Sequence, residues 1–175
     1  MYYQNVRSFN NKLSYLRSSV NLLTYTPAVL MFTETWLKPT TNDAELGLKK
    51  FCIFRLDRHD SPSNCVRGGG VLLAVNRKFK STLLENASLT ESVFLKVESK
   101  TAKFIIAVVY LPPDSSTIEY RRFLAALEDF SSRHPQHKLC VTRSARLMHS
   151  SCFLYTQQKA TLWTSCLPLL IVQST

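Results

Sequence analysis

The fold of this chain is decided by the stretch from Ala28 to Leu37, which reads AVLMFTETWL. Residues 28–33 form a continuous apolar run that ends in Thr33, a pattern typical of a strand covered on both faces. The run stops abruptly at Glu34. Because functional groups in α/β units lie just beyond the carboxyl ends of strands, Glu34 is the first candidate for a functional residue.

The residues before this stretch predict a strand and a helix. Tyr2–Val6 reads as a short first strand, and Asn10 is a plausible N-cap for the helix that follows. Apolar residues at positions 13, 16, 20 and 23 are spaced 3, 4 and 3 apart, which places them on one helix face. Pro27 ends this element. Strand, helix and strand together predict a βαβ unit.

The rest of the chain predicts a strand-rich α/β domain whose helices cover its sheets. Residues 38–50 are expected to form a loop with a short helical turn. Gly68-Gly69-Gly70 precedes a strand rather than a helix, so it is interpreted as a turn or bulge and not as a phosphate-binding loop. Further elements are predicted as strands at 51–56, 71–75, 79–84, 92–97, 104–110 and 138–142, and as an amphipathic helix at 118–130.

The composition is that of one basic domain. The chain has 175 residues, 45% of them hydrophobic, and a formal net charge of +10. This apolar fraction argues against a disordered chain, and no apolar run reaches the length of a membrane span. The five cysteines have no CxxC spacing, and no secretory leader is visible. We therefore expect reduced thiols and an intracellular protein, with the nucleus as one location.

Acidic residues and glycines are missing from the C-terminal part. The last acidic residue is Asp129 and the last glycine is Gly70. A globular domain seldom goes so long without a residue that readily adopts positive φ in its turns. We therefore expect that the C-terminal portion was not selected as part of this domain.

Three polar residues stand where predicted strands end: Asn5, Glu34 and Tyr110. Glu34 is either a cap or solvated residue, or a ligand of a hard cation such as Mg²⁺. Asn5 is either a strand-end turn residue or a group that orients Glu34 or binds the metal. Tyr110 either has a structural partner or donates a hydrogen bond to a phosphate oxygen.

These residues belong to five segments that occur in a characteristic order: 4–8 (QNVRS), 32–37 (FTETWL), 54–58 (FRLDR), 67–75 (RGGGVLLAV) and 108–113 (VVYLPP). The segments resemble those of the endonuclease/exonuclease/phosphatase superfamily. Within it, they are similar to the apurinic-type endonuclease domain of jockey-like non-LTR retrotransposon polyproteins.

The resemblance implies a four-layer α/β sandwich of the DNase I-like type that hydrolyses phosphodiesters with Mg²⁺ or Mn²⁺. It assigns Asn5 and Glu34 to the metal and Tyr110 to the scissile phosphate. It also implies DNA as the partner, with no membrane and no small-molecule cofactor, because such an endonuclease nicks target DNA. The freed 3′ end primes a reverse transcriptase further along the polyprotein. Arginines that fall in loops near the substrate of this family are Arg7, Arg55, Arg58 and Arg67; the alternative is that they serve solubility.

The chain departs from the family after the strand at 138–142. The family carries Gly-Asp-Phe-Asn there, and this chain reads Arg143-Ser144-Ala145-Arg146. His149 comes too early for the family's catalytic histidine, and no acidic residue remains to orient it. We therefore expect residues 1–142 to be the N-terminal part of the domain, clipped at its start. Residues 143–175 are expected to be an unrelated, disordered or frameshifted tail.

Three functional hypotheses follow from these observations. The first is an inactive endonuclease with an incomplete four-layer sandwich, because the groups that activate water are missing. The second is a non-catalytic basic remnant that binds nucleic acid. The third is an unstable fragment that aggregates through open sheet edges.

Overall fold

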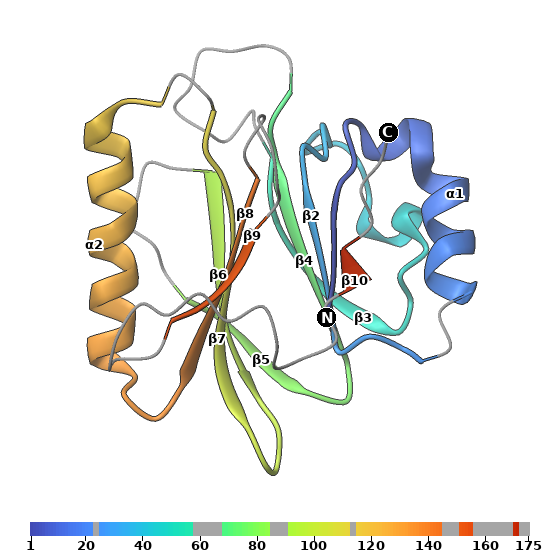
Figure 1. The fold of residues 1–175 in the computed structure, drawn as a ribbon. Helices are drawn as coiled ribbons and strands as arrows, with labels where there is room; N and C mark the ends of the chain where they lie inside the picture. The colour runs from blue at the N-terminus through green and yellow to red at the C-terminus, as the bar shows by residue number, and fades with distance from the viewer. Residues whose placement is uncertain are drawn as a thin grey trace.

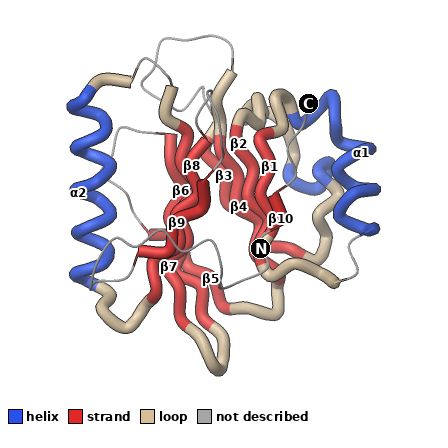
Figure 2. Tube along the Cα trace, in the orientation of Figure 1, coloured by secondary structure: helices blue, strands red, loops and turns tan. Residues whose placement is uncertain are grey.

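The protein is arranged in four layers, in the order helix, sheet, sheet, helix (Figure 1). The computed structural model describes residues 1–22, 25–57, 68–84, 91–112, 115–144, 151–155 and 170–171. The two sheets lie face to face, with α1 (Phe9–Leu22) on the outside of one and α2 (Thr117–Arg133) on the outside of the other (Figure 2). The expected four-layer α/β sandwich is thus confirmed.

Each sheet contains five strands in the described part of the chain. The first sheet has the order β10-β1-β2-β4-β3, with strands β10 (Leu170–Ile171), β1 (Tyr2–Asn5), β2 (Val29–Thr33), β4 (Val71–Asn76) and β3 (Phe51–Leu56). The second has the order β5-β6-β7-β8-β9, with strands β5 (Lys80–Leu84), β6 (Glu91–Glu98), β7 (Lys103–Tyr110), β8 (Lys138–Ser144) and β9 (Ser151–Tyr155).

The topology contains the predicted βαβ unit. Strands β1 and β2 are parallel neighbours joined by α1, and β7 and β8 are parallel neighbours joined by α2. The other pairs are antiparallel, except that β10 runs parallel to β1. Figure 1 shows that the carboxyl ends of β1, β2 and β7 lie at one end of the sandwich, the upper end in that view.

The alternation of side chains along β2 explains why its sequence is apolar throughout. Val29 and Met31 pack into the core between the two sheets, whereas Leu30 and Phe32 pack into the core beneath α1. Since successive side chains of a strand point to opposite faces, a strand buried on both faces needs apolar residues at every position. Strand β4 follows the same rule, with Leu73 in the core between the sheets and Leu72 beneath α1.

A third core fixes α2 on the second sheet. Phe123 and Phe130 of the helix pack against Phe94 of β6, with ring centroids 6.5 Å and 4.6 Å from the Phe94 centroid. The helix begins with a capping box, in which the Ser116 side chain accepts from the Glu119 amide and the Glu119 carboxylate accepts from the Ser116 amide. A local cap and a buried apolar face thus determine this helix together.

The predicted start of α1 is wrong by two residues. The helix begins at Phe9, so Asn10 lies inside it and is not the N-cap. The physical reason is that a neighbouring loop satisfies the first amides: Ser8 N donates to Glu34 O (2.9 Å) and Phe9 N to Thr35 O (2.8 Å). No capping side chain is needed for amides that already have backbone partners.

Part of the chain beyond residue 142 also pairs with the sheets. Strand β8 runs on to Ser144, β9 pairs with it, and β10 pairs with β1. The domain boundary at residue 142 and the separate origin of residues 143–175 stay predictions. In the described segments, no helix is long and apolar enough to cross a membrane.

Candidate functional site

Two of the predicted site residues meet at the ends of β1 and β2. Asn5 is the last residue of β1, and its Nδ2 donates to Oε1 of Glu34 at 3.2 Å. Glu34 follows directly after β2 and is only 7% exposed. The parallel pairing of the two strands, with Asn5 opposite Thr33, brings about this contact between residues far apart in sequence.

The loops around the Asn5–Glu34 pair have unusual backbone conformations. Among the described residues, four non-glycine residues have positive φ: Arg7 (44°), Ser8 (86°), Glu34 (53°) and Trp36 (53°). All four lie in the two loops that follow β1 and β2. Such conformations cost about 1–3 kcal/mol each and cluster at functional sites. The backbone itself therefore marks this end of the sandwich as a candidate site.

The glycine segment forms the other side of the same site. Gly69 O and Gly70 O accept from Trp36 N (3.1 Å) and Thr35 N (3.2 Å). Gly70 has a φ of 82°, and a Cβ there would lie 2.5 Å from Oγ1 of Thr35. The segment is thus the turn beside a strand that the sequence predicts, and its glycines let two loops approach closely.

A buried carboxylate that the sequence analysis missed anchors this segment. Glu91, at the start of β6, is 5% exposed, and its Oε2 accepts from Gly70 N at 2.7 Å. The bond joins the first sheet to the second. In sequence, Glu91 stands one residue before a predicted strand and resembles a solvated loop acid, because its partner lies 21 residues away. No local signal identifies it.

Tyr110 lies at the same end of the sandwich, as the last residue of β7. It is 8% exposed, packs in the core between the sheets, and stands directly opposite Glu91 in the β6–β7 ladder. Residues directly opposite in an antiparallel pair share one face of the sheet. A chain of contacts thus leads from Glu34 through Thr35 and Gly70 to Glu91 and Tyr110.

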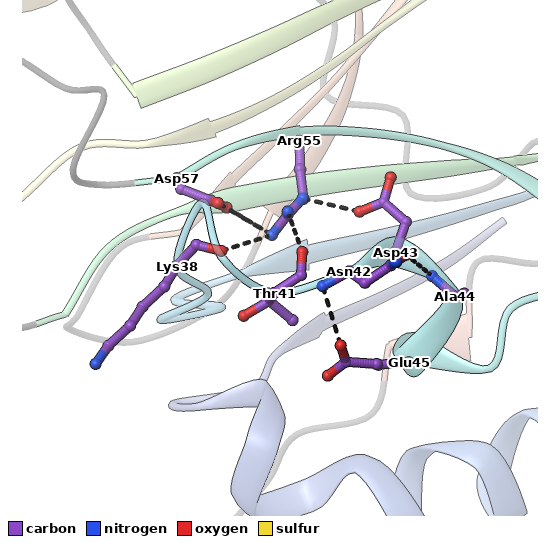
Figure 3. Close-up of polar contacts among 8 residues, drawn as sticks. All are labelled: Lys38, Thr41, Asn42, Asp43, Ala44, Glu45, Arg55 and Asp57. Atoms are coloured by element: carbon purple, nitrogen blue, oxygen red, sulfur yellow. Dashed lines mark hydrogen bonds and ion pairs between the residues drawn. The ribbon is translucent and has the colours of Figure 1, made fainter.

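The structure places Arg55 in a network with the loop that follows β2 (Figure 3). Its guanidinium pairs with Asp43 (Nε to Oδ1, 2.9 Å) and Asp57 (Nη1 to Oδ2, 3.0 Å) and donates to Thr41 O (Nη2, 2.6 Å). The Arg55 side chain is 16% exposed. These contacts join β3 to the loop before it, so Arg55 has a structural task, while its role toward DNA stays a prediction.

Of the other three predicted arginines, only Arg7 lies within the described residues. Arg7 is exposed in the loop after β1, one residue before the amide that bonds Glu34 O. Arg7 is thus an exposed cation in the loop that bonds the backbone of Glu34. Arg58 and Arg67 lie outside the described residues.

The metal-binding capacity of this site rests on one carboxylate. Glu34 is held in place by the Asn5 amide, which leaves its second oxygen, Oε2, outside that hydrogen bond. The described segments contain no group of three or more His, Cys, Asp or Glu residues that could hold a metal ion. Glu34 with the Asn5 amide would suit a cation that keeps most of its waters and needs one or two carboxylates, as Mg²⁺ does.

Comparison with known proteins gives a match in structure alone. No family model matches the chain, and no curated protein matches it. The three solved structures below align with TM-scores of 0.50–0.53 at 10–18% identity, so they show a common fold.

The human Nocturnin catalytic domain has a TM-score of 0.51 and 18% identity, over 77% of this chain and 56% of that one. The endonuclease domain of TRAS1, a telomere-specific non-LTR retrotransposon, has a TM-score of 0.53 and 10% identity, over 84% and 58%. The Neisseria 3′ phosphatase NExo, bound to a product DNA hairpin, has a TM-score of 0.50 and 17% identity, over 81% and 55%. The chain thus spans a little over half the length of these structures. It has the α/β sandwich fold of the endonuclease/exonuclease/phosphatase superfamily, as its motifs predict.

Proposed function

We propose that this chain is part of a metal-dependent DNA endonuclease domain of a non-LTR retrotransposon and that it has lost the ability to hydrolyse DNA. The observation that carries the proposal is the Asn5–Glu34 pair, held by left-handed backbone where β1 and β2 end. The choice of family branch rests on the sequence motifs, and a retrotransposon endonuclease domain is among the structures that have this fold.

In this proposal the residues of the site have separate tasks. Glu34 holds Mg²⁺ or Mn²⁺, and Asn5 orients its carboxylate or contributes to the ion. Tyr110 positions the scissile phosphate, and Arg7 contacts the DNA backbone from the neighbouring loop. The cation supplies charge neutralisation at the phosphate.

Water activation is the missing part. Residues 143–146 read Arg-Ser-Ala-Arg where the family carries Gly-Asp-Phe-Asn at the end of the corresponding strand. None of these four residues is acidic, so no carboxylate is present at the end of this strand to orient or deprotonate water. Because such groups act as a unit, their loss costs orders of magnitude in rate.

A nicking assay on supercoiled plasmid tests the inactivity. With Mg²⁺ or Mn²⁺ present, the purified chain is expected to nick no faster than its Glu34→Ala variant. Nicking by the unmodified chain that disappears in Glu34→Ala would overturn this part of the proposal.

Metal binding is tested separately from catalysis. Titration with Mn²⁺, followed by water-proton relaxation, is expected to show binding that Glu34→Gln removes. The Gln side chain keeps an acceptor for the Asn5 amide but loses the charge. The matched control is Glu128→Gln, which neutralises an exposed carboxylate on α2. Equal Mn²⁺ binding by Glu34→Gln and the unmodified chain would contradict the assignment of Glu34.

The second candidate function is DNA binding without catalysis, and the net charge of +10 favours it. It predicts binding that weakens steeply with salt, depends little on base sequence and survives Glu34→Ala. Failure to bind DNA at low ionic strength would remove this candidate.

A further inference from the structure

Trp36 is an exposed aromatic side chain in the middle of the candidate site. It is 40% exposed, whereas Thr35 and Leu37 on either side are buried at 0% and 2%. It stands two residues after Glu34. Tryptophan is highly buried on average, and this exposed indole follows a buried carboxylate by only two residues.

The backbone of Trp36 is fixed in a strained conformation. Its φ is 53°, a region in which a bulky residue is a genuine outlier. Hydrogen bonds hold the loop from two sides: Ser8 N and Phe9 N donate to the carbonyls of Glu34 and Thr35, and Trp36 N donates to Gly69 O. The indole is therefore presented from a rigid loop, and little backbone entropy is lost when a ligand packs on it.

The surroundings of Trp36 combine a flat apolar ring with positive charge. Arg7 lies in the adjoining loop and Lys38 follows two residues later, and both are exposed. An exposed ring, with one exposed cation two residues along the chain and another in the adjoining loop, fits a ligand that has a flat aromatic face and an anionic backbone. Nucleic acids have this combination, because every base offers a π-face and every linkage a phosphate.

We propose that the Trp36 indole stacks on a nucleobase of the bound DNA, close to the scissile phosphate at the candidate site. The inference rests on the proposed function for DNA binding and deepens it by naming a contact to a base. It differs from the roles of the arginines, which contact phosphate, because stacking requires the base itself.

Intrinsic fluorescence tests the contact directly, since the chain has only two tryptophans, Trp36 and Trp163. The Trp163→Phe variant keeps Trp36 as the single reporter. A short single-stranded oligonucleotide is expected to quench its emission, whereas an abasic strand of equal length and charge is expected to quench little. Equal quenching by both strands would overturn the stacking contact.

Affinity measurements on two variants complete the test. Trp36→Ala is expected to weaken binding of the base-containing strand about 5- to 150-fold, the range of one base–aromatic stack, and to leave binding of the abasic strand unchanged. Trp36→Phe is expected to retain part of the affinity. The matched control is Tyr15→Ala, which removes an aromatic side chain that is 57% exposed on α1.

The outcomes separate this inference from the proposed function. Full affinity in Trp36→Ala, with DNA still bound, would overturn the stacking contact and leave the DNA-binding proposal standing. Absence of DNA binding by the unmodified chain would overturn both.

Discussion

At the scale of single residues, the site is defined by backbone conformations that its side chains do not favour. Arg7, Ser8, Glu34 and Trp36 adopt positive φ although none of them is glycine. The hydrogen bonds among the loops after β1 and β2 and the glycine segment offset this cost. No sequence rule predicts such residues, because the loops impose the conformation on each other.

Gly70 and Gly47 both have positive φ, and together they give a matched test of this close packing. Gly70→Ala introduces a Cβ 2.5 Å from the buried Thr35 Oγ1, whereas Gly47→Ala introduces one against the flexible Arg17 guanidinium. Both variants carry the left-handed penalty of about 1–2 kcal/mol. We expect Gly70→Ala to cost about 1–3 kcal/mol more in the free energy of unfolding, measured in urea, because a buried neighbour cannot move aside as easily.

Removal of the Thr35 hydroxyl tests whether the contact with Thr35 causes the extra penalty of Gly70→Ala. In a Thr35→Ala background, the penalty of Gly70→Ala is expected to fall to that of Gly47→Ala, because the clashing hydroxyl is gone. An unchanged penalty in that background would show that Thr35 is not the obstacle.

At the scale of elements, ionisable side chains just after α2 contact strand β6. His134 caps the helix and contacts His137, with ring centroids 5.5 Å apart, and His137 Nε2 lies 3.3 Å from Glu98 Oε1. Burial lowers the pKa of His134 below its ordinary value, and the nearby charges of His137, Lys96 and Arg133 lower it further. The folded state therefore prefers neutral His134.

This preference predicts a pH dependence of stability. A depressed pKa means that the unfolded chain takes up the proton first, so the contribution of His134 is complete above about pH 6.5 and is lost as the pH falls toward the lower folded-state pKa. The unfolding midpoint is expected to fall over this window, and less steeply in His134→Gln. Denaturant titrations at a series of pH values measure both slopes, and identical slopes would contradict the assignment.

At the scale of the whole molecule, the two sheets are held together mainly by apolar packing. The Glu91–Gly70 bond is a polar contact that spans the layers at the candidate site. Another is the contact of Thr142 Oγ1 with Met31 Sδ at 3.3 Å. The Glu91 contact therefore couples the stability of the sandwich to the geometry of the glycine segment.

Substitution of Glu91 tests this coupling. Glu91→Ala leaves the Gly70 amide without that acceptor and is expected to lower the free energy of unfolding by about 1–3 kcal/mol. Glu91→Gln retains an acceptor oxygen and is expected to lose less. Chemical denaturation measures both, and equal losses in the two variants would show that the bond to Gly70 is not the stabilising feature.

The sequence by itself determined the elements and the kinds of residue at the site. Apolar runs and 3–4 spacing predict β2, β4, β7 and α2 closely and the existence of α1, because burial of a strand or helix face imposes a local pattern on the residues that form it. The motifs around Asn5 and Glu34 predict their proximity, since parallel neighbours end at the same edge of a sheet.

The tertiary structure alone decided what depends on partners distant in the chain. The burial of Glu91, the engagement of Arg55 with Asp43 and Asp57, and the start of α1 at Phe9 each depend on another segment. The physical reason is the same in all three cases. A carboxylate, a guanidinium or a backbone amide has the same local sequence signal whether water or a distant protein group satisfies it, and only the packing of the loops decides which one does.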